Sequence, residues 1–409
     1  MTIQNTGDDT AMMAGRPVSS ISVQIFVLAA LASVGSFATS ILLPSLPSIA
    51  KTLNVSTAAV ASTISVYLAV FALGQLAVGP LSDRFGRWKP VVFGLAIFVA
   101  GSVWCEFATD LPMMLIGRSI QALGACAASV LSRAIARDLL SGEELTRALA
   151  FVMVAMSAAP GFSPLIGGLL DATFGWRSEF FAVGVFGLLV LTAFLRYVGE
   201  THNFDVKTSM QPLAIAKVYW NLATDIRFIA PAGTIGLFMG AIFAMFSVTP
   251  RILIDGLGYT PLQLGLFFAA TVFVVFGSGI FAPRLAKMIG HSRATIVGLA
   301  IAALGGAALL VSHFLPHTIW GYLLPVIIFL SGFGMVSPLA TATTLQPFGD
   351  RAGSASALLG FLQMGGASIG VAVTASIASA TLAIGLVQAA MTLLGLGLYL
   401  AGQKATGAK

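Results

Sequence analysis

The sequence predicts an all-α integral membrane protein of twelve transmembrane helices, arranged as two pseudo-symmetric six-helix bundles. Three observations predict this fold class. Hydrophobic residues make up 57% of the 409 residues and charged residues only 9%, whereas a soluble domain carries roughly 25% charged residues. Apolar stretches of about 20 residues, enough to cross a bilayer, recur along the whole chain. The longest polar connection falls near the middle of the chain.

The composition also excludes several classes of protein. So few charged residues cannot cover a soluble enzyme or a disordered chain. The net charge of +6 is spread in small groups between apolar runs, whereas a nucleic-acid binder clusters its basic residues on one face. The two cysteines, Cys105 and Cys126, lie inside apolar runs and provide no disulfide framework. The expected partner is therefore the lipid bilayer, with no nucleic acid. No cofactor is expected, and the chain is expected to be a monomer.

Twelve apolar stretches are long enough to span the membrane. The first twenty residues lack the basic-then-apolar pattern of a cleaved signal, so the first span is expected to stay in the mature protein. In chain order the predicted spans are 22–44, 58–79, 89–108, 112–132, 148–170, 178–197, 226–248, 261–282, 294–312, 320–344, 353–374 and 381–402.

The basic residues predict the orientation. With the N-terminus inside, 17 of the 21 lysines and arginines fall in cytoplasmic segments. Lys51, Arg177 and Arg251 fall on the opposite side, and Arg118 lies within a span. Positive charge on retained loops determines topology, so both termini are expected in the cytoplasm.

The polar connection over 199–225 predicts a cytoplasmic linker between an N-terminal bundle, 1–198, and a C-terminal bundle, 226–409. A shift of 204 residues, half the chain, supports a duplication. It aligns Leu81 with Leu285, Gly86 with Gly290 and Gly161 with Gly365. Two six-helix halves with a substrate site between them are the plan of many transporters.

The loop between the second and third spans carries the sharpest motif, G-x-x-x-D-R-x-G-R. Its glycines permit a close helix end and a tight turn, and its charges could pair with neighbouring helix ends or only fix the topology. The arrangement resembles the loop signature of the major facilitator superfamily, which implies a conformational gate. The residues concerned are Gly79, Asp83, Arg84, Gly86 and Arg87.

The fourth span carries Arg118, Gln121 and Gly124 in the pattern R-x-x-Q-x-x-G. An arginine inside a span is functional by default, although it could also reach the outer interface with its long side chain. The pattern is similar to the fourth-helix motif of the drug:proton antiporters of the same superfamily. That resemblance implies a role for Arg118 in proton coupling.

The fifth span resembles the antiporter motif G-P-x-x-G-G, with Ser163 where a glycine is usual. Its prolines loosen the helix and its glycines allow a neighbouring helix to approach, although ordinary packing of small residues would give the same pattern. The predicted kink involves Pro160, Gly161, Pro164, Gly167 and Gly168.

Further stretches in the second half, 351–360 and the Ile254-Asp255 pair before Tyr259, are similar to the bicyclomycin- and chloramphenicol-resistance-like branch. The resemblance covers essentially the whole chain. It implies the major facilitator fold and proton-coupled efflux of small lipophilic compounds, of the antibiotic-resistance type, across a bacterial inner membrane.

One departure from the branch concerns the first helix. The branch typically has an aspartate just before the Leu-Pro step, where this sequence has Ser40 before Leu43-Pro44. A mechanism for cationic drugs that rests on a first-helix carboxylate therefore does not carry over.

By elimination, the sequence predicts that Glu106 couples to protons together with Arg118. Four acids, Asp110, Asp171, Glu179 and Asp255, are assigned to the outer ends of spans, which leaves Glu106 as the acid placed inside one. A short loop joins its helix to that of Arg118. The alternative is that Glu106 only reaches the lipid headgroups.

A cargo-binding wall is predicted from helix faces. Ser36, Thr39, Ser40 and Leu43 form one stripe of the first helix. Methionine and phenylalanine suit varied lipophilic ligands because they repack and stack, although most such residues in a membrane protein face lipid or the core. The predicted wall consists of Ser36, Thr39, Ser40, Gln121, Met153, Met156, Ser157, Phe243, Phe246 and Phe361.

Rival functions are a dedicated exporter of one metabolite, such as an amino-acid derivative or siderophore, and a membrane-embedded enzyme. The four histidines lie in loops or at span ends, and the spans show no nucleophile or metal motif, so no enzyme is expected. No ATP-binding loop, charged pore ring or carbonyl filter is visible either.

Overall fold

The computed structural model describes residues 21–201, 212–316 and 318–406, and these form helices joined by short turns. The α-helices, in chain order, are α1 (Ile21–Ser40), α2 (Leu46–Leu53), α3 (Thr57–Phe85), α4 (Trp88–Glu106), α5 (Leu111–Leu139), α6 (Gly142–Phe174), α7 (Arg177–Tyr197), α8 (Pro212–Thr224), α9 (Ile226–Pro250), α10 (Pro261–Ile289), α11 (His291–Ser312), α12 (Ile319–Leu345), α13 (Ala352–Ala375) and α14 (Ala380–Thr406). Short helical turns η1 (Leu43–Ser45), η2 (Arg251–Gly256) and η3 (Gln346–Arg351) connect some of them.

The predicted membrane spans agree with these helices. Within the described residues, eleven helical segments are long and apolar enough to cross a membrane. Helix α6, with 33 residues, is about 50 Å long and completes the set of twelve. The first span, Ile21–Leu53, is broken, because Pro44 and Pro47 supply no backbone N–H to the helix. The predicted all-α membrane fold is confirmed.

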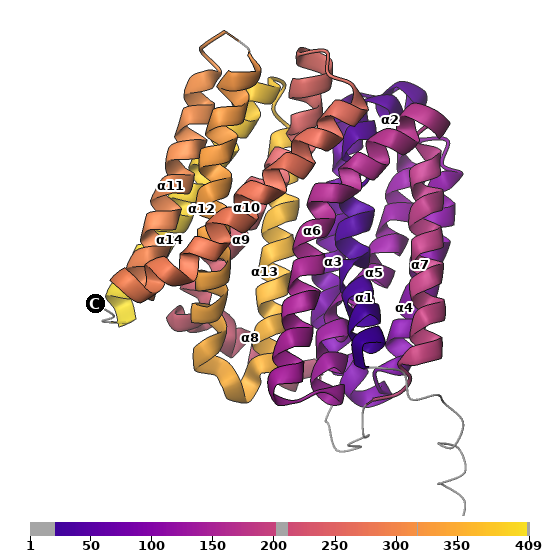
Figure 1. The fold of residues 1–409 in the computed structure, drawn as a ribbon, viewed down its shortest axis with the longest axis vertical. Helices are drawn as coiled ribbons and strands as arrows, with labels where there is room; N and C mark the ends of the chain where they lie inside the picture. The colour runs from indigo at the N-terminus through magenta and orange to yellow at the C-terminus, as the bar shows by residue number, and fades with distance from the viewer. Residues whose placement is uncertain (1–20, 202–211, 317, 407–409) are drawn as a thin grey trace, which may run out of the picture.

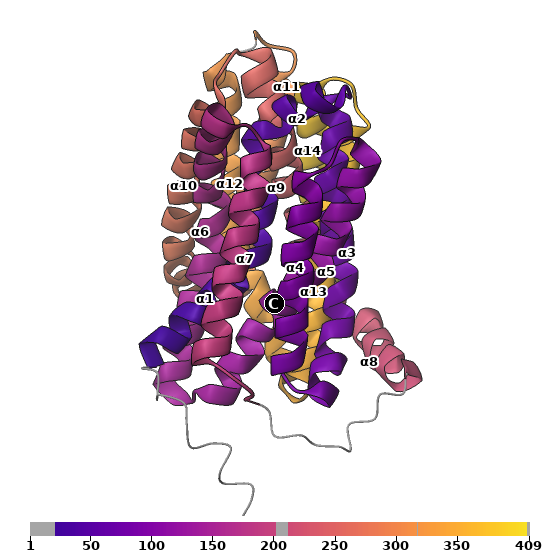
Figure 2. The same ribbon diagram turned by 90° about the vertical axis from the view of Figure 1, so that its right-hand side faces the viewer.

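The helices form two groups that meet along a central interface (Figures 1 and 2). In the first group α1 packs on α5, α6 and α7, and α4 on α5 and α7. In the second group α9 packs on α12, α13 and α14, and α11 on α12 and α14. Two pairs of long helices, α3 with α13 and α6 with α10, join the groups.

The duplication inferred from sequence is visible in matching elements. Helices α3 and α10 each have 29 residues and begin 204 residues apart, at Thr57 and Pro261. Each is followed by a glycine of positive φ, Gly86 at 84° and Gly290 at 90°. A left-handed backbone favours glycine, which explains why these two positions align.

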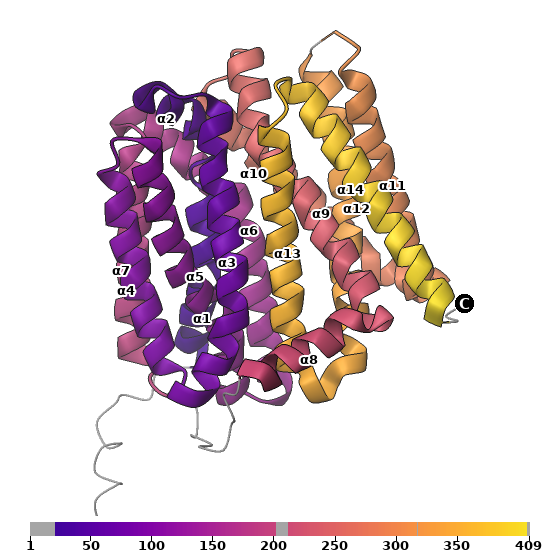
Figure 3. The ribbon, with the colours of Figure 1, turned by 180° about the vertical axis from the view of Figure 1, so that it is seen from behind.

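The linker is partly helical, which the sequence analysis did not predict. Helix α8 (Pro212–Thr224) crosses the end of the bundle opposite α2 and packs on α9 and α13 (Figure 3). The Tyr219 hydroxyl donates a hydrogen bond to the Leu76 carbonyl oxygen of α3 at 3.3 Å. Between α8 and α9, the Arg227 guanidinium bonds Asp225 at 2.7 Å and holds the pKa of that carboxyl below its usual range.

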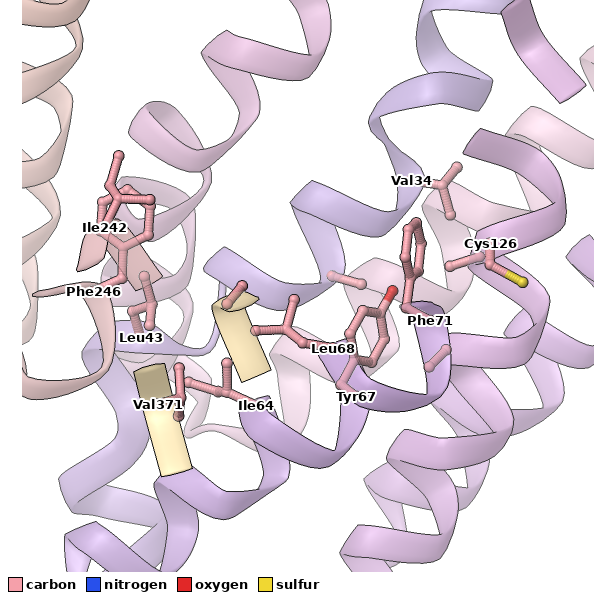
Figure 4. Packing of buried hydrophobic residues seen from close by; sticks show 14 of the residues in the cluster. Val34, Leu43, Ile64, Tyr67, Leu68, Phe71, Cys126, Ile242, Phe246 and Val371 are labelled. Carbon is pink, nitrogen blue, oxygen red and sulfur yellow. The ribbon is translucent and has the colours of Figure 1, made fainter. Parts of the chain in front are cut away.

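The core is continuous from one group to the other. In Figure 4, Leu43 lies beside Ile242 and Phe246 of α9, and Ile64 lies near Val371 of α13. These side chains are buried and apolar. Near the α2 end of the molecule, the turn η1 contacts α6, α9 and α10. The break in the first span therefore places a short, non-α segment against both groups.

Candidate functional site

Arg118 lies at the centre of a fully buried polar cluster within the first group of helices. Its side chain is 0% exposed. Its Nη1 donates to the carbonyl oxygen of Ala38 at 3.1 Å and to Oε1 of Gln121. Gln121 in turn donates to the Ser102 hydroxyl at 2.8 Å. The Arg118 guanidinium carbon lies 4.1 Å from the ring centroid of Tyr67, which gives a cation–π contact.

The end of α1 explains why a guanidinium sits in this place. Helix α1 ends at Ser40, so the carbonyl of Ala38 is among the last four, which lack intrahelical donors. A cation near these carbonyls also complements the helix dipole. The Nε and Nη2 atoms of Arg118 and the Ser40 hydroxyl are buried and have no hydrogen-bond partner. The cluster thus offers unused donors at the break in the first span.

The structure does not bring the side chains of Glu106 and Arg118 into contact, and their joint role in proton coupling stays a prediction. Cys105 lies near Arg118, and neighbouring residues on a helix point about 100° apart. Glu106 is therefore turned away and partly exposed, and its backbone oxygen accepts from Arg177 at 3.1 Å. Within the described part of the chain, no ion pair joins Arg118 to a carboxylate.

The expectation that Glu106 is the only acid within a span is wrong. Glu179, in the first turn of α7, is 0% exposed. Asp171 lies in the last turn of α6 and is half-buried. In the sequence both stand at the ends of apolar runs, where acids ordinarily meet water. No local pattern indicates the burial of Glu179, because it depends on Ser45, which is distant in sequence.

The motif loop between α3 and α4 contacts α5 and the segment that follows α7, within the N-terminal group of helices. Arg87 pairs through Nε with Asp138 of α5 at 3.2 Å, and its backbone N–H donates to Glu200 at 2.9 Å. Arg84 is exposed. The side chain of Asp83 lies outside the described residues, so its predicted pairing remains a prediction.

Two features of the turn at Gly86 require glycine, and replacing this residue tests whether the turn stabilises the protein. Its φ is 84°, and a Cβ there would lie 2.4 Å from the Glu200 carboxylate. We expect Gly86→Ala to lower the free energy of unfolding by about 1–3 kcal/mol, measured as thermal unfolding in detergent. Gly79→Ala is the matched control, since a Cβ at Gly79 meets nothing within 4 Å. Equal effects of the two changes would contradict the assigned role of the turn.

The antiporter-motif glycines of α6 lie where the two groups of helices cross. A Cβ at Gly161 would lie 1.6 Å from Val272 of α10, and one at Gly168 would lie 2.5 Å from the Pro261 carbonyl oxygen. Gly265 of α10 faces the backbone of α6 in the same way. These contacts leave room only for glycine between α6 and α10.

The remaining motif residues shape α6 itself. Pro160 and Pro164 both lie inside the continuous helix Gly142–Phe174. Ser163 satisfies its hydroxyl by donating to the Ala159 carbonyl at 2.6 Å. A Cβ at Gly167 would collide with the carbonyl of Ile41 at the end of α1. The motif thus packs against α1 as well as α10.

The predicted cargo wall is distributed over both groups of helices. Thr39, Ser40 and Gln121 are buried in or beside the Arg118 cluster. Phe243 and Phe246 contact each other edge to face at 5.7 Å. The other described members are half-buried, and the side chains of two lie outside the described residues. The half-buried members are Ser36, Met156 and Phe361, and the two undescribed side chains are Met153 and Ser157.

Three relatives share most of their length with this chain. The uncharacterized MFS-type transporter YdgK of Bacillus subtilis is 29% identical over 83% of this chain and 85% of its own. Multidrug resistance protein D of Escherichia coli is 28% identical over 87% and 88%. Multidrug resistance protein MdtL of Citrobacter koseri is 30% identical over 79% and 81%.

Solved structures share the fold at low identity. The peptide transporter POT in complex with sulfate superposes with a TM-score of 0.73 at 16% identity, over 97% of this chain and 98% of that one. The human organic anion transporter MFSD10 gives a TM-score of 0.70 at 16% identity, over 93% and 100%. The sequence model of the Major Facilitator Superfamily matches residues 28–371. This chain is therefore a multi-pass membrane transporter that belongs to the major facilitator superfamily.

Proposed function

We propose that the protein is a secondary active transporter that exports small lipophilic compounds in exchange for protons. The observation that carries this proposal is the buried Arg118 cluster, which has unused donors beside the break in the first span. An uncompensated cation in a membrane span is expensive and is retained for function. Two of the relatives described above are named multidrug resistance proteins, which supports efflux as the direction of transport.

Alternating access would move residues 1–198 against residues 226–409, with 199–225 as the connection. Hydrogen bonds between α3 and α13 are among the contacts that join the two groups of helices. The Ser65 hydroxyl donates to the Ser368 carbonyl at 3.0 Å, and Gln75 donates to the Gly360 carbonyl at 3.4 Å. Small residues and weak hydrogen bonds allow two helices to slide or rock without breaking a packed core.

Cargo would bind between the halves, against the wall formed by α1, α6, α9 and α13. Phe243, Phe246 and Phe361 supply apolar contacts, and Ser36 and Ser40 supply hydroxyls. Because Ser40 replaces an acid and Arg118 has unused donors, neutral or anionic cargo is favoured over cations. The same observation supports the second candidate, an exporter of one anionic metabolite.

A panel of drug sensitivities distinguishes the two candidates. An efflux-deficient bacterial host expressing this chain is compared with the same host expressing the Arg118→Ala variant, which is expected to be inactive. Raised resistance to several unrelated lipophilic drugs supports multidrug efflux. Resistance to none of them supports the dedicated exporter. Export of none of the tested metabolites and drugs would contradict both candidates.

We further propose a bacterial inner-membrane location with both termini in the cytoplasm, which makes the α2 end the outer end. Reporter fusions after Ala50, which lies in α2, and after Lys207, which lies in the linker, should then report opposite sides. The physical reason is the excess of basic residues in the expected inner segments. Alkaline phosphatase and green fluorescent protein fusions measure this, and finding both sites on one side would overturn the topology.

A further inference from the structure

A buried carboxyl group lies at the outer end of the N-terminal half, away from the Arg118 cluster. Glu179 is 0% exposed. The Ser45 hydroxyl donates a hydrogen bond to its Oε1, whereas its Oε2 is buried without any hydrogen-bond partner. No ion pair involves Glu179 among the described residues. A carboxylate charge held in such a place is costly, which makes its presence a functional clue.

A second carboxyl group connects this site to the surface. Asp171 of α6 is half-buried and interacts both with Ser45 and, through its charge, with Glu179. It also accepts hydrogen bonds from the Ser48 hydroxyl at 2.8 and 3.0 Å. The two acids and two serines therefore form one chain from the surface to Oε1 of the buried Glu179.

The serine that donates to Glu179 belongs to the turn η1, which contacts both halves. Ser45 is the last residue of η1, which contacts α6 of the N-terminal half and α9 and α10 of the C-terminal half. Next to η1, α2 contacts η2 of the C-terminal half. A change at Glu179 thus acts directly on the contacts that close the outer end.

We propose that Glu179, with Asp171 as its connection to solvent, is a proton-binding site that controls the outer end of the transporter. A proton from the external solution passes to the Asp171 carboxylate and then to the Glu179 carboxylate. The neutral Glu179 is buried beneath η1, and the outer end closes. Loss of that proton back through Asp171 leaves a charge that requires water, and the outer end opens. This inference rests on the alternating-access function proposed above.

The other charged groups near the outer end of α7 have different partners or are exposed. Arg177, on α7 itself, donates to the backbone carbonyls of Glu106 and Ala108 and stacks on Trp176 at 4.2 Å. Lys51 of α2 is exposed, and the Glu106 side chain is partly exposed at the end of α4. Asp171 is therefore the group placed to exchange a proton with Glu179.

The test measures the opening of the outer end against pH in the absence of cargo. Spin labels at Lys51→Cys and Gly256→Cys, both exposed positions of α2 and η2, report the distance across the interface in lipid nanodiscs. We expect a single short distance at acidic pH and a growing longer-distance population as the pH rises. Glu179→Gln should remove this response and keep the short distance at every pH.

The matched control is Asp110→Asn, an outer-end acid outside the chain whose cap on α5 asparagine can maintain. It should leave the pH response intact. Should Glu179→Gln fail to insert, Glu179→Asp keeps an acid and should shift the midpoint of the response. An unchanged response in the Glu179 variants, or no response in the otherwise wild-type labelled chain, would overturn the inference.

Failure of this inference can be told apart from failure of the proposed function. Export is measured separately in cells, with chloramphenicol, ethidium and carboxyfluorescein as neutral, cationic and anionic probes. Export without the pH-dependent distance change contradicts the role of Glu179 alone. A pH-dependent distance change with no export of any probe supports the gate and contradicts the proposed lipophilic cargo.

Discussion

Arg118→Ala should abolish transport and lower the stability of the folded protein. The change removes the donor to Ala38 and Gln121, which leaves two buried acceptors unsatisfied, and opens a cavity under Tyr67. Together these losses correspond to about 2–5 kcal/mol. Efflux of a fluorescent probe from cells and thermal unfolding in detergent measure the two effects.

Arg118→Lys separates the effect of Arg118 on transport from its effect on the stability of the folded protein. Lysine keeps the positive charge at the end of α1 but lacks the two donors that Arg118 leaves unused, Nε and Nη2, and the planar group that contacts the Tyr67 ring. We expect normal amounts of protein in the membrane and transport reduced at least about tenfold, which corresponds to about 1.4 kcal/mol. Wild-type transport by Arg118→Lys would show that charge alone matters, and wild-type transport by Arg118→Ala would contradict the site.

Gly161→Ala should block movement at the crossing of α6 and α10. Its new Cβ would lie 1.6 Å from Val272, and forcing a methyl group into a packed contact costs about 1–3 kcal/mol. Because this crossing joins the two halves, the change should reduce transport strongly as well as stability. Initial rates of probe efflux, corrected for the amount of protein in the membrane, measure it.

A second substitution can relieve that collision. Val272→Ala removes the methyl group that Gly161→Ala meets, so the double variant should recover a large part of the lost transport. Gly365→Ala, the equivalent position in the C-terminal half, is the control, because a Cβ there meets nothing within 4 Å. Equal losses at Gly161 and Gly365, or no recovery in the double variant, would exclude steric contact as the cause.

The sequence predicted the membrane spans well because each depends on local composition. A run of about 20 apolar residues has no other stable place, and the helix ends agree with the polar residues that flank each run. The duplicated turn at Gly86 and Gly290 was predictable for the same reason, since positive φ selects glycine. Helix α8 was not predicted, because a short surface helix beside a polar segment lacks that strong signal.

The polar interior depends on contacts between distant segments, and these are not readable from local sequence. Glu106 was predicted as the proton-coupling acid because the other acids were placed at the ends of spans. However, the helix rotation that turns Cys105 toward Arg118 turns Glu106 away. Glu179 was assigned to the outer surface because of its place in the chain. Its burial depends on Ser45, which is 134 residues away in sequence. No local pattern contains that information.

Proton-coupled export requires that cargo drive protons across the membrane in the opposite direction. Everted membrane vesicles are energised to acidify their interior, and a pH-sensitive dye reports the interior pH as chloramphenicol, ethidium or carboxyfluorescein is added. Proton-coupled export predicts that a transported probe raises the interior pH, and that vesicles carrying Arg118→Lys respond at least about tenfold less. Uptake of a probe into wild-type vesicles with no change in interior pH, and at the same rate after the pH gradient is collapsed, would contradict the account.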